Sequence, residues 1–358
     1  MDPAALIPVP DALPVHWYWF DLMLLLTFFL HIVFMNVMLG TACIVTLTHL
    51  FSKGEGSLLC ESTAQGLPSI IALTVNLGVA PLLFIQVLYG HLLYTSSILM
   101  GVFWLWIIGT LITAYYLAYL YKYKYNKLHS GRFLLTAAIT LLLLFIGFVF
   151  TNNTTLMLNP GSWTRYFDQP HGFLLNTADK TILPRYLHFI TSAIAVGGLS
   201  LALFFSGKVK KGDLQAGAMV TQGCQWFTGA TLVNFASGTW FLESLPQGLL
   251  TSSGTPVWFL IFLFCGITSG IVAAVLAMRE QVHGAAASAL LSIFFMVLVR
   301  DRVRSAFLEP WFSPTELTVQ PQYAPLLLFL IICAGGLLLI VWMIRLVMAA
   351  DKKQEARS

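Results

Sequence analysis

Charged residues are scarce in this chain. Asp, Glu, Lys and Arg make up 9% of its 358 residues, whereas hydrophobic residues make up 58%. A soluble domain carries charge at roughly a quarter of its positions, and no water-soluble fold could cover so much apolar surface. The composition therefore excludes a soluble globular protein. We interpret the net charge of +4 as a matter of membrane topology and expect no nucleic acid partner.

The sequence also lacks cysteine pairs with a metal-binding or redox spacing. Its five cysteines form no CxxC pair, and there is no CxxCH motif. Covalent haem attachment, a zinc knuckle and a disulfide framework therefore have no support. We expect most of the cysteines to be small buried apolar residues.

Asp, Glu, Lys and Arg are missing from the centres of the apolar segments. Proton-coupled transporters and pumps usually need such groups inside the membrane, so their absence weakens a transporter or permease hypothesis. Only the pairs Gly197-Gly198 and Gly335-Gly336 hint at the broken helices that a transporter would need.

What the chain does contain is a series of apolar segments of roughly 18 to 30 residues, long enough to cross a bilayer as helices. Only a helix satisfies its own backbone hydrogen bonds in lipid. The sequence predicts an all-α integral membrane protein, a single polytopic domain over residues 1–358, with about nine transmembrane helices. The predicted spans are approximately Tyr18–Leu50, Leu67–Tyr89, Ile98–Tyr121, Phe133–Phe150, Pro184–Phe205, Gln215–Leu242, Val257–Met278, Ala285–Val299 and Tyr323–Val347.

The loop charges predict the orientation. With the N-terminus outside and the C-terminus inside, 13 of the 19 Lys and Arg residues, Lys53 and Arg357 among them, fall on the inner side, as the positive-inside rule requires. Arg300, Arg302 and Arg304 run against this trend. They indicate either a site for a carboxylate, such as a haem propionate or an acidic partner, or an amphipathic helix solvated among the lipid headgroups.

Histidines are the chemically versatile residues within the apolar segments. His31 and His188 lie within predicted spans and His91 lies at the end of one. A histidine at membrane depth needs a partner for its ring nitrogens, commonly a metal or a hydrogen-bonded neighbour. His188 is followed at helical spacing by three small residues, Thr191, Ala195 and Gly198, which suit either a porphyrin lying against the helix or close helix packing.

His31 shares its helical face with Met35 and Met38. Histidine and methionine both ligate haem iron, although methionine on an apolar helix is more often part of the core. The remaining histidines, His16, His49, His129, His171 and His283, fall at span ends or in loops, where solvated or interfacial roles are expected.

Four features, in this order, resemble subunit I of the cytochrome bd family over about residues 17 to 205. They are His31 in LTFFLHIVFMNVMLG, the segment VNLGVAPLLFIQVLYG (Asn76 to Gly90), the turn TLMLNPGSW (Thr155 to Trp163), and His188 at the start of the fifth span. In that family the two histidines ligate haem. The resemblance divides the domain into a ligand-bearing half, 1–206, and a half with weaker resemblance, 207–358.

The sequence also departs from this family. The third span, Ile98 to Tyr121, has no acid, where the oxidases carry glutamates that serve oxygen reduction. The quinol-binding loop shrinks to about Glu243 to Pro256. The family's seventh-span methionine has no clear match, so Met296 in the eighth is the candidate ligand. Terminal oxygen reduction is therefore not expected, and whether the chain is an enzyme stays open.

The resemblance implies a membrane subunit that holds one or two b haems and passes electrons between membrane quinol and an extracytoplasmic partner such as a c-type cytochrome. It implies His31 and His188 as iron ligands, Arg300 and Arg302 as propionate partners, and His91 as a third ligand or a quinol contact. The expected location is the bacterial inner membrane. No catalytic residue is identified.

Two alternatives remain. A haem-free quinol-binding anchor of a redox complex would have its histidines hydrogen-bonded to Thr, Ser or backbone carbonyls, with no cavity in front of them. A transporter or permease would need a polar path at the midplane.

Overall fold

The computed structural model describes residues 3–51, 58–128, 131–168, 170–249 and 256–355. Lys53, His129 and Arg357, on which predictions were made, lie outside the described residues, as does the middle of the shortened loop between Glu243 and Pro256.

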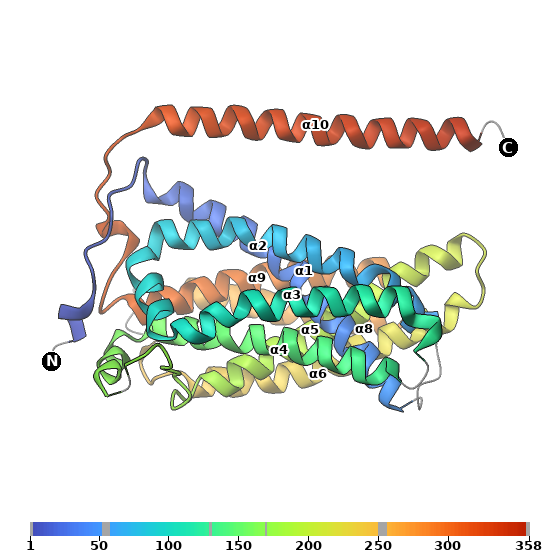
Figure 1. Ribbon diagram of the computed structural model, residues 1–358, viewed down its shortest axis with the longest axis horizontal. Coiled ribbons are helices and arrows are strands. Elements are labelled where there is room, and N and C mark those ends of the chain that lie inside the picture. Colours follow the sequence, from blue (N-terminus) through green and yellow to red (C-terminus); the bar gives the residue numbers. More distant parts are fainter. Residues whose placement is uncertain (1–2, 52–57, 129–130, 169, 250–255, 356–358) are drawn as a thin grey trace.

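Within the described residues the chain is built from long helices connected by short segments (Figure 1). The long helices are α1 (Trp17–Phe51), α2 (Leu58–Leu99), α3 (Gly101–Lys124), α4 (Gly131–Leu158), α5 (Ile182–Lys210), α6 (Ala216–Ser244), α8 (Pro256–Met278), α9 (Val282–Leu308) and α10 (Tyr323–Glu355). Eight of them are long and apolar enough to cross a membrane. The exception is α6, whose length suffices but whose polar residues lower its hydropathy. An all-α membrane protein is thus confirmed, and the nine-span count and the orientation stay predictions.

Four helices, α2, α4, α9 and α10, extend eight residues or more beyond the predicted spans, because polar turns continue them. α2 runs from Leu58 to Leu99 and bends at Tyr89, where φ is −129° and ψ is 24°. α9 continues through the RDRVRS segment to Leu308, because the charges of that segment pair with each other and with α1, as described below. Hydropathy alone ends a helix where its apolar residues stop, whereas paired polar side chains allow it to continue.

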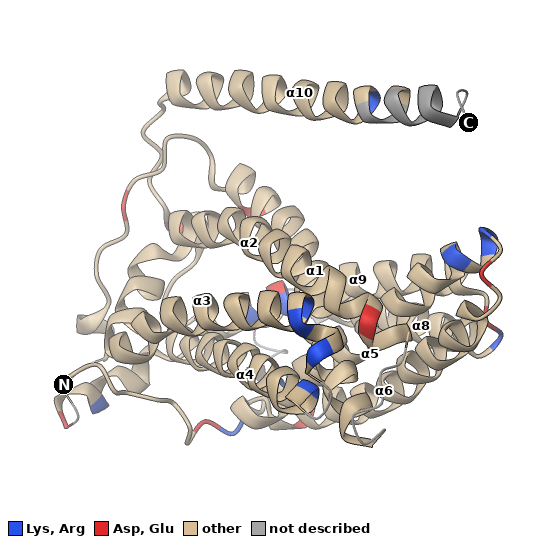
Figure 2. Cartoon of the chain, turned by 45° about the vertical axis from the view of Figure 1, so that its right-hand side comes forward, with Lys and Arg blue, Asp and Glu red and all other residues tan. Residues whose placement is uncertain are grey.

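The two ends of the bundle carry different basic residues. Arg300, Arg302 and Arg304 lie near the end that holds the start of α1, and we call it the arginine end. Lys122, Lys124, Lys208 and Lys210 lie near the opposite end, which we call the lysine end (Figure 2).

Consecutive helices pack as antiparallel pairs, α1 with α2, α3 with α4, α5 with α6, and α8 with α9. The pairs are joined chiefly where α1 lies against α5. The two larger buried apolar clusters follow from this packing. One lies around the α1–α5 contact and includes Leu39, Ile44 and Phe205; the other lies toward the arginine end and includes Leu88, Tyr89 and Trp163.

The α1–α5 contact depends on glycine. A Cβ added to Gly40 would overlap the carbonyl oxygen of Ala193, and one added to Gly197 would lie 2.5 Å from the carbonyl carbon of Gly40. Small residues let transmembrane helices approach this closely and gain packing energy that lipid cannot supply.

We therefore expect Gly40→Ala to destabilise the bundle by about 1 to 3 kcal/mol, the usual cost of overpacking. Gly109→Ala in α3 is the matched control, because an added Cβ there meets nothing within 4 Å. It should stabilise its helix by up to about 1 kcal/mol, since alanine is the better helix former. Unfolding titrations in mixed micelles would measure both. Equal effects of the two substitutions would contradict the proposed tight contact.

The segment between α4 and α5 caps the arginine end. The indole Nε1 of Trp163 donates to the carbonyl of Leu156 at 2.8 Å, and Trp163 is buried. Asn152 and Asn153 are also buried; the former accepts from the backbone N–H of Asn176 and the latter from the Ser96 hydroxyl. The side chains of Asn152 and Asn153 are therefore part of the cap.

α10 runs apart from the other helices (Figures 1 and 2), and its apolar window is fully exposed. The segment that precedes α10 is nonetheless held in place, because Gln320 N donates to Leu13 O and Leu13 N donates to Thr318 O, both at 2.8 Å. This short parallel pairing joins the segment before α1 to the segment before α10.

Candidate functional site

His31 projects from α1 toward α2. Its Nδ1 lies 3.1 Å from the carbonyl oxygen of Thr74, and a carbonyl can only accept a hydrogen bond. Gly78, one turn further along α2, leaves room for the ring: a Cβ there would lie 2.8 Å from His31 Cε1. α2 therefore fixes both the position of the imidazole and the nitrogen that carries its proton.

His188 projects from α5 toward α6 in the same manner. Its Nδ1 lies 3.1 Å from the carbonyl oxygen of Asn234. Gly238, again four residues beyond the residue whose carbonyl accepts the hydrogen bond, makes room for the ring, since a Cβ there would lie 3.0 Å from His188 Cε1. The Asn234 side chain is held in turn by a hydrogen bond from Thr191 at 2.7 Å.

The two histidine sites repeat one pattern. In each, a histidine on the first helix of a pair bonds a carbonyl on the second helix, and a glycine four positions later faces the ring. Gly40 follows His31 by nine positions, and Gly197 follows His188 by nine. Since Gly40 and Gly197 meet at the α1–α5 contact, the two histidines lie at matching heights on either side of it, toward the arginine end.

This arrangement leaves the second ring nitrogen of each histidine available. Apart from the Nδ1 contacts, neither ring makes a hydrogen bond within the described part of the chain. With Nδ1 protonated, Nε2 of the neutral ring carries a lone pair. A carbonyl bonded to Nδ1 is the usual way in which proteins orient a histidine that ligates a metal through Nε2.

An arginine lies one helical turn toward the arginine end from each histidine. The Arg300 guanidinium stacks over the ring of Phe28 at 4.3 Å, and Phe28 precedes His31 by three positions on α1. Arg185 precedes His188 by three positions on α5, and its guanidinium stacks over Phe241 at 4.8 Å. Neither arginine forms an ion pair within the described residues, and Nε and Nη2 of Arg185 are buried without a hydrogen-bond partner.

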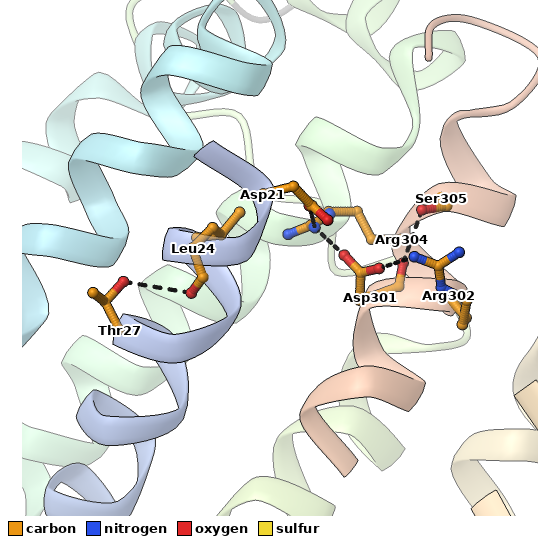
Figure 3. Close-up of polar contacts among 7 residues, drawn as sticks. All are labelled: Asp21, Leu24, Thr27, Asp301, Arg302, Arg304 and Ser305. Atoms are coloured by element: carbon orange, nitrogen blue, oxygen red, sulfur yellow. Dashed lines mark hydrogen bonds and ion pairs between the residues drawn. The ribbon is translucent and has the colours of Figure 1, made fainter. Parts of the chain in front are cut away.

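The other two arginines of the α9 triplet are paired internally (Figure 3). Asp301 binds Arg302 at 2.5 Å and also binds Arg304, and Arg304 lies 3.7 Å from Asp21 of α1. Asp301 and Arg304 have side chains only 3% and 5% exposed, so this part of the triplet is not solvated among headgroups. Arg304 also stacks over Tyr89 at the bend of α2. The network thus ties together α1, α2 and α9.

The predicted arginine sites differ in availability. Arg300 has no carboxylate partner among the described residues, as a propionate partner requires. Arg302 is engaged by Asp301, although its side chain is 33% exposed. As a propionate partner Arg302 is therefore less suited than Arg300.

His91 lies beyond the bend of α2, away from the pattern shared by the other two. Its ring makes an edge contact with Phe312 at 4.4 Å between centroids. Its Nε2 is buried without a hydrogen-bond partner. No contact in the described structure brings this ring to His31 or His188, so its role as a third ligand or quinol contact stays a prediction.

Met296 lies one turn before Arg300 on α9. Its sulfur is 3.6 Å from the position of a Cβ on Gly266 of α8, and no described contact places it against either histidine. The small residues after His188 serve helix packing, because a Cβ on Gly198 would lie 2.7 Å from Trp226 Cβ on α6. Porphyrin contact along that face is therefore not required to explain them.

Sequence reasoning missed three participants: Arg185, Gly78 and Gly238. Arg185 entered the topology prediction only as one of the basic residues on the outer side. The role of the two glycines depends on a contact with a histidine ring on another helix, which the sequence does not show. The equal spacing from each histidine to its contact glycine is a signal that the sequence does carry.

The described residues contain no group of three or more His, Cys, Asp or Glu side chains that could hold a bare metal ion. They instead provide one available nitrogen on each of His31 and His188, with the unpaired guanidinium of Arg300 or Arg185 about one helical turn away. The comparisons with family models, curated proteins and solved structures returned no match. The resemblance to cytochrome bd subunit I therefore stays a prediction from the residues quoted for it.

Proposed function

We propose that the protein is a b-haem-binding membrane subunit that transfers electrons between membrane quinol and a redox partner, such as a c-type cytochrome, at the arginine end. The observation that carries this proposal is the repeated histidine site. Two membrane helices each hold an imidazole with Nδ1 bonded to a neighbouring carbonyl and Nε2 left available, and each imidazole has an unpaired arginine one turn away.

The residues present fit a haem. His31 and His188 would supply axial nitrogens, and Arg300 and Arg185 would bind the propionates, since guanidinium pairs strongly with carboxylate. The buried, unpartnered nitrogens of Arg185 are otherwise a costly feature of a protein interior. Met296 remains the candidate for a second axial position, and Arg302 a secondary propionate contact.

A bound haem would supply reversible one-electron chemistry at iron, with a potential tuned by its axial ligands and its surroundings. The chain's own contribution is positioning. Thr74 and Asn234 hold the ring tautomers through their carbonyls, Gly78 and Gly238 admit the rings, and the cap over the arginine end excludes water.

The second candidate is a haem-free quinol-binding anchor, which is favoured by the same Nδ1 hydrogen bonds, because they satisfy half of each ring without a metal. It leaves the unpaired arginines and the free Nε2 atoms unexplained. The bend of α2 at Tyr89 would suit a transporter, whereas the described spans place no Asp, Glu, Lys or Arg near their centres.

The visible spectrum of the purified protein separates these candidates. After expression with ample haem, the dithionite-reduced minus oxidised spectrum should show an alpha band of the b type. A haem content of about two per chain is expected from the two equivalent sites, measured as the pyridine adduct. Protein that is folded by size-exclusion chromatography and has no such band would rule out the proposal and favour the anchor.

A further inference from the structure

Among the long helices in the described part of the chain, α6 alone is too polar to be recognised as a span, and two of its polar residues lie on one face. Gln222 and Gln225 share this face with Trp226, Gly229 and Val233, which follow at helical spacing. A face of this kind on a helix within a membrane bundle indicates a polar neighbour.

This face borders an open groove between α5 and α6 with a volume of about 510 Å³. Its walls are formed by Thr191, Ile194, Gln222, Gln225, Trp226, Gly229, Ala230 and Val233. The hollow exists partly because Gly229 has no side chain, since a Cβ there would meet nothing within 4 Å. The volume lies within the range of small-molecule sites.

The two glutamines of the groove lack partners. Neither Gln222 nor Gln225 makes a hydrogen bond to any residue that the structure describes. A primary amide offers two donors and an acceptor, and leaving these unpaired in an apolar environment is unfavourable. Beside them, Trp226 is held in place because its Cβ packs tightly against Gly198 of α5.

The groove is connected to the His188 site. Thr191, on its wall, donates to the Asn234 side chain at 2.7 Å, and the Asn234 carbonyl accepts from His188 Nδ1 at 3.1 Å. The groove extends from there toward the lysine end, where Gln222 lies six residues into α6, about 9 Å along its axis at 1.5 Å per residue.

We propose that this groove binds the head group of a membrane quinone. The flat ring lies against Trp226, and the amides of Gln222 and Gln225 donate to its oxygens. The isoprenoid tail leaves through the open side. A phospholipid headgroup would call for a cation, and no charged residue lines the groove. A neighbouring apolar helix would leave both amides unpaired.

This inference rests on the proposed function for the identity of its ligand and deepens it. Gln225 and Gln222 precede Asn234, the contact of His188, by nine and twelve positions on α6. The proposal therefore places the quinone on the lysine-end side of the His188 site, whereas the redox partner is expected at the arginine end. The quinone and the redox partner would thus bind at different positions along the axis of the bundle.

The test uses the full-length protein in nanodiscs that contain no quinone, with short-chain ubiquinone and menaquinone analogues as probes in a direct binding titration. Gly229→Leu fills the groove, and Gln222→Leu with Gln225→Leu removes both amides. Each should weaken binding about tenfold or more, because two hydrogen bonds contribute roughly 0.5 to 1.5 kcal/mol each and 1.4 kcal/mol is tenfold in affinity. Gly217→Leu, on α6 outside the groove and equally free of neighbours, should leave affinity within about twofold of the parent.

A photoreactive quinone analogue provides a readout that does not depend on the variants folding. Label in α6 between Gln222 and Val233 supports the proposal, and label found only elsewhere overturns it. Binding that is not saturable, or that Gly229→Leu leaves unchanged in a folded variant, also overturns it and indicates lipid or a protein helix at this face. Haem content is measured separately and distinguishes the two proposals. A haem band without quinone binding would refute only the proposed quinone site, and quinone binding at the groove without a haem band would refute only the proposed haem binding.

Discussion

Replacing His188 with alanine is expected to abolish haem binding at the α5–α6 site and to halve the haem content. The ring supplies the only histidine nitrogen on this helix pair near the groove. Loss of a residue that merely orients a metal ligand already costs roughly 10- to 100-fold in affinity, and loss of the ligand itself should cost more. The reduced-minus-oxidised spectrum should lose one of two components and keep the other.

Two controls make this result interpretable. His16→Ala changes an exposed histidine near the start of α1 and should leave the spectrum unchanged. Gly238→Ala keeps the histidine but places a Cβ 3.0 Å from its Cε1, so it should shift or weaken the same component without removing it. An unchanged spectrum for folded His188→Ala protein would refute this ligand.

Breaking the Asp301 network should produce the largest loss of stability. Asp301 neutralises both Arg302 and Arg304, and its side chain is only 3% exposed. Removing one partner of a buried pair leaves an uncompensated charge, which costs about 3 to 5 kcal/mol. Asp301→Leu should therefore destabilise the protein by at least this amount in unfolding titrations in mixed micelles, and Arg304→Leu by a similar amount.

The double substitution Asp301→Leu with Arg304→Leu distinguishes charge from packing. It removes the charge at both positions, so it should recover part of the loss, because apolar replacement of a buried pair is often neutral or stabilising. Additive losses in the double variant would mean that the two side chains act independently and would contradict the network. Arg302→Leu, at the more exposed member, should cost less than either.

The helices themselves could be predicted from the sequence because hydropathy is a local property. Each predicted span falls mainly on one long helix, although the third begins at Ile98 on the last turn of α2. The larger errors fall where side chains from other helices intervene. α9 extends past Val299 because Asp301 pairs with Arg304 and Asp21 lies nearby. α6 was predicted as a span despite its polarity, and the groove gives that polarity a structural reason.

The candidate site was predictable only in its central residues. His31, His188 and Arg300 were identified because an imidazole or a guanidinium in an apolar segment is unusual in itself. Their carbonyl partners on Thr74 and Asn234 were not, since a backbone acceptor has no sequence signature. The role of Arg185 likewise depends on Phe241, which lies on another helix and is more than fifty positions away.

The pairing of Leu13 with Val319 bears on the order of assembly. These two segments lie about 300 residues apart in the chain, so during synthesis the strand before α1 must wait, unpaired, until nearly every other helix has entered the membrane. Closing so long a loop is entropically unfavourable unless the intervening helices have already brought its ends together. The pairing of Leu13 with Val319 is therefore expected to form last, after the helix bundle is complete. Its protection against proteolysis would report, in a pulse-labelled cell, the moment at which insertion ends.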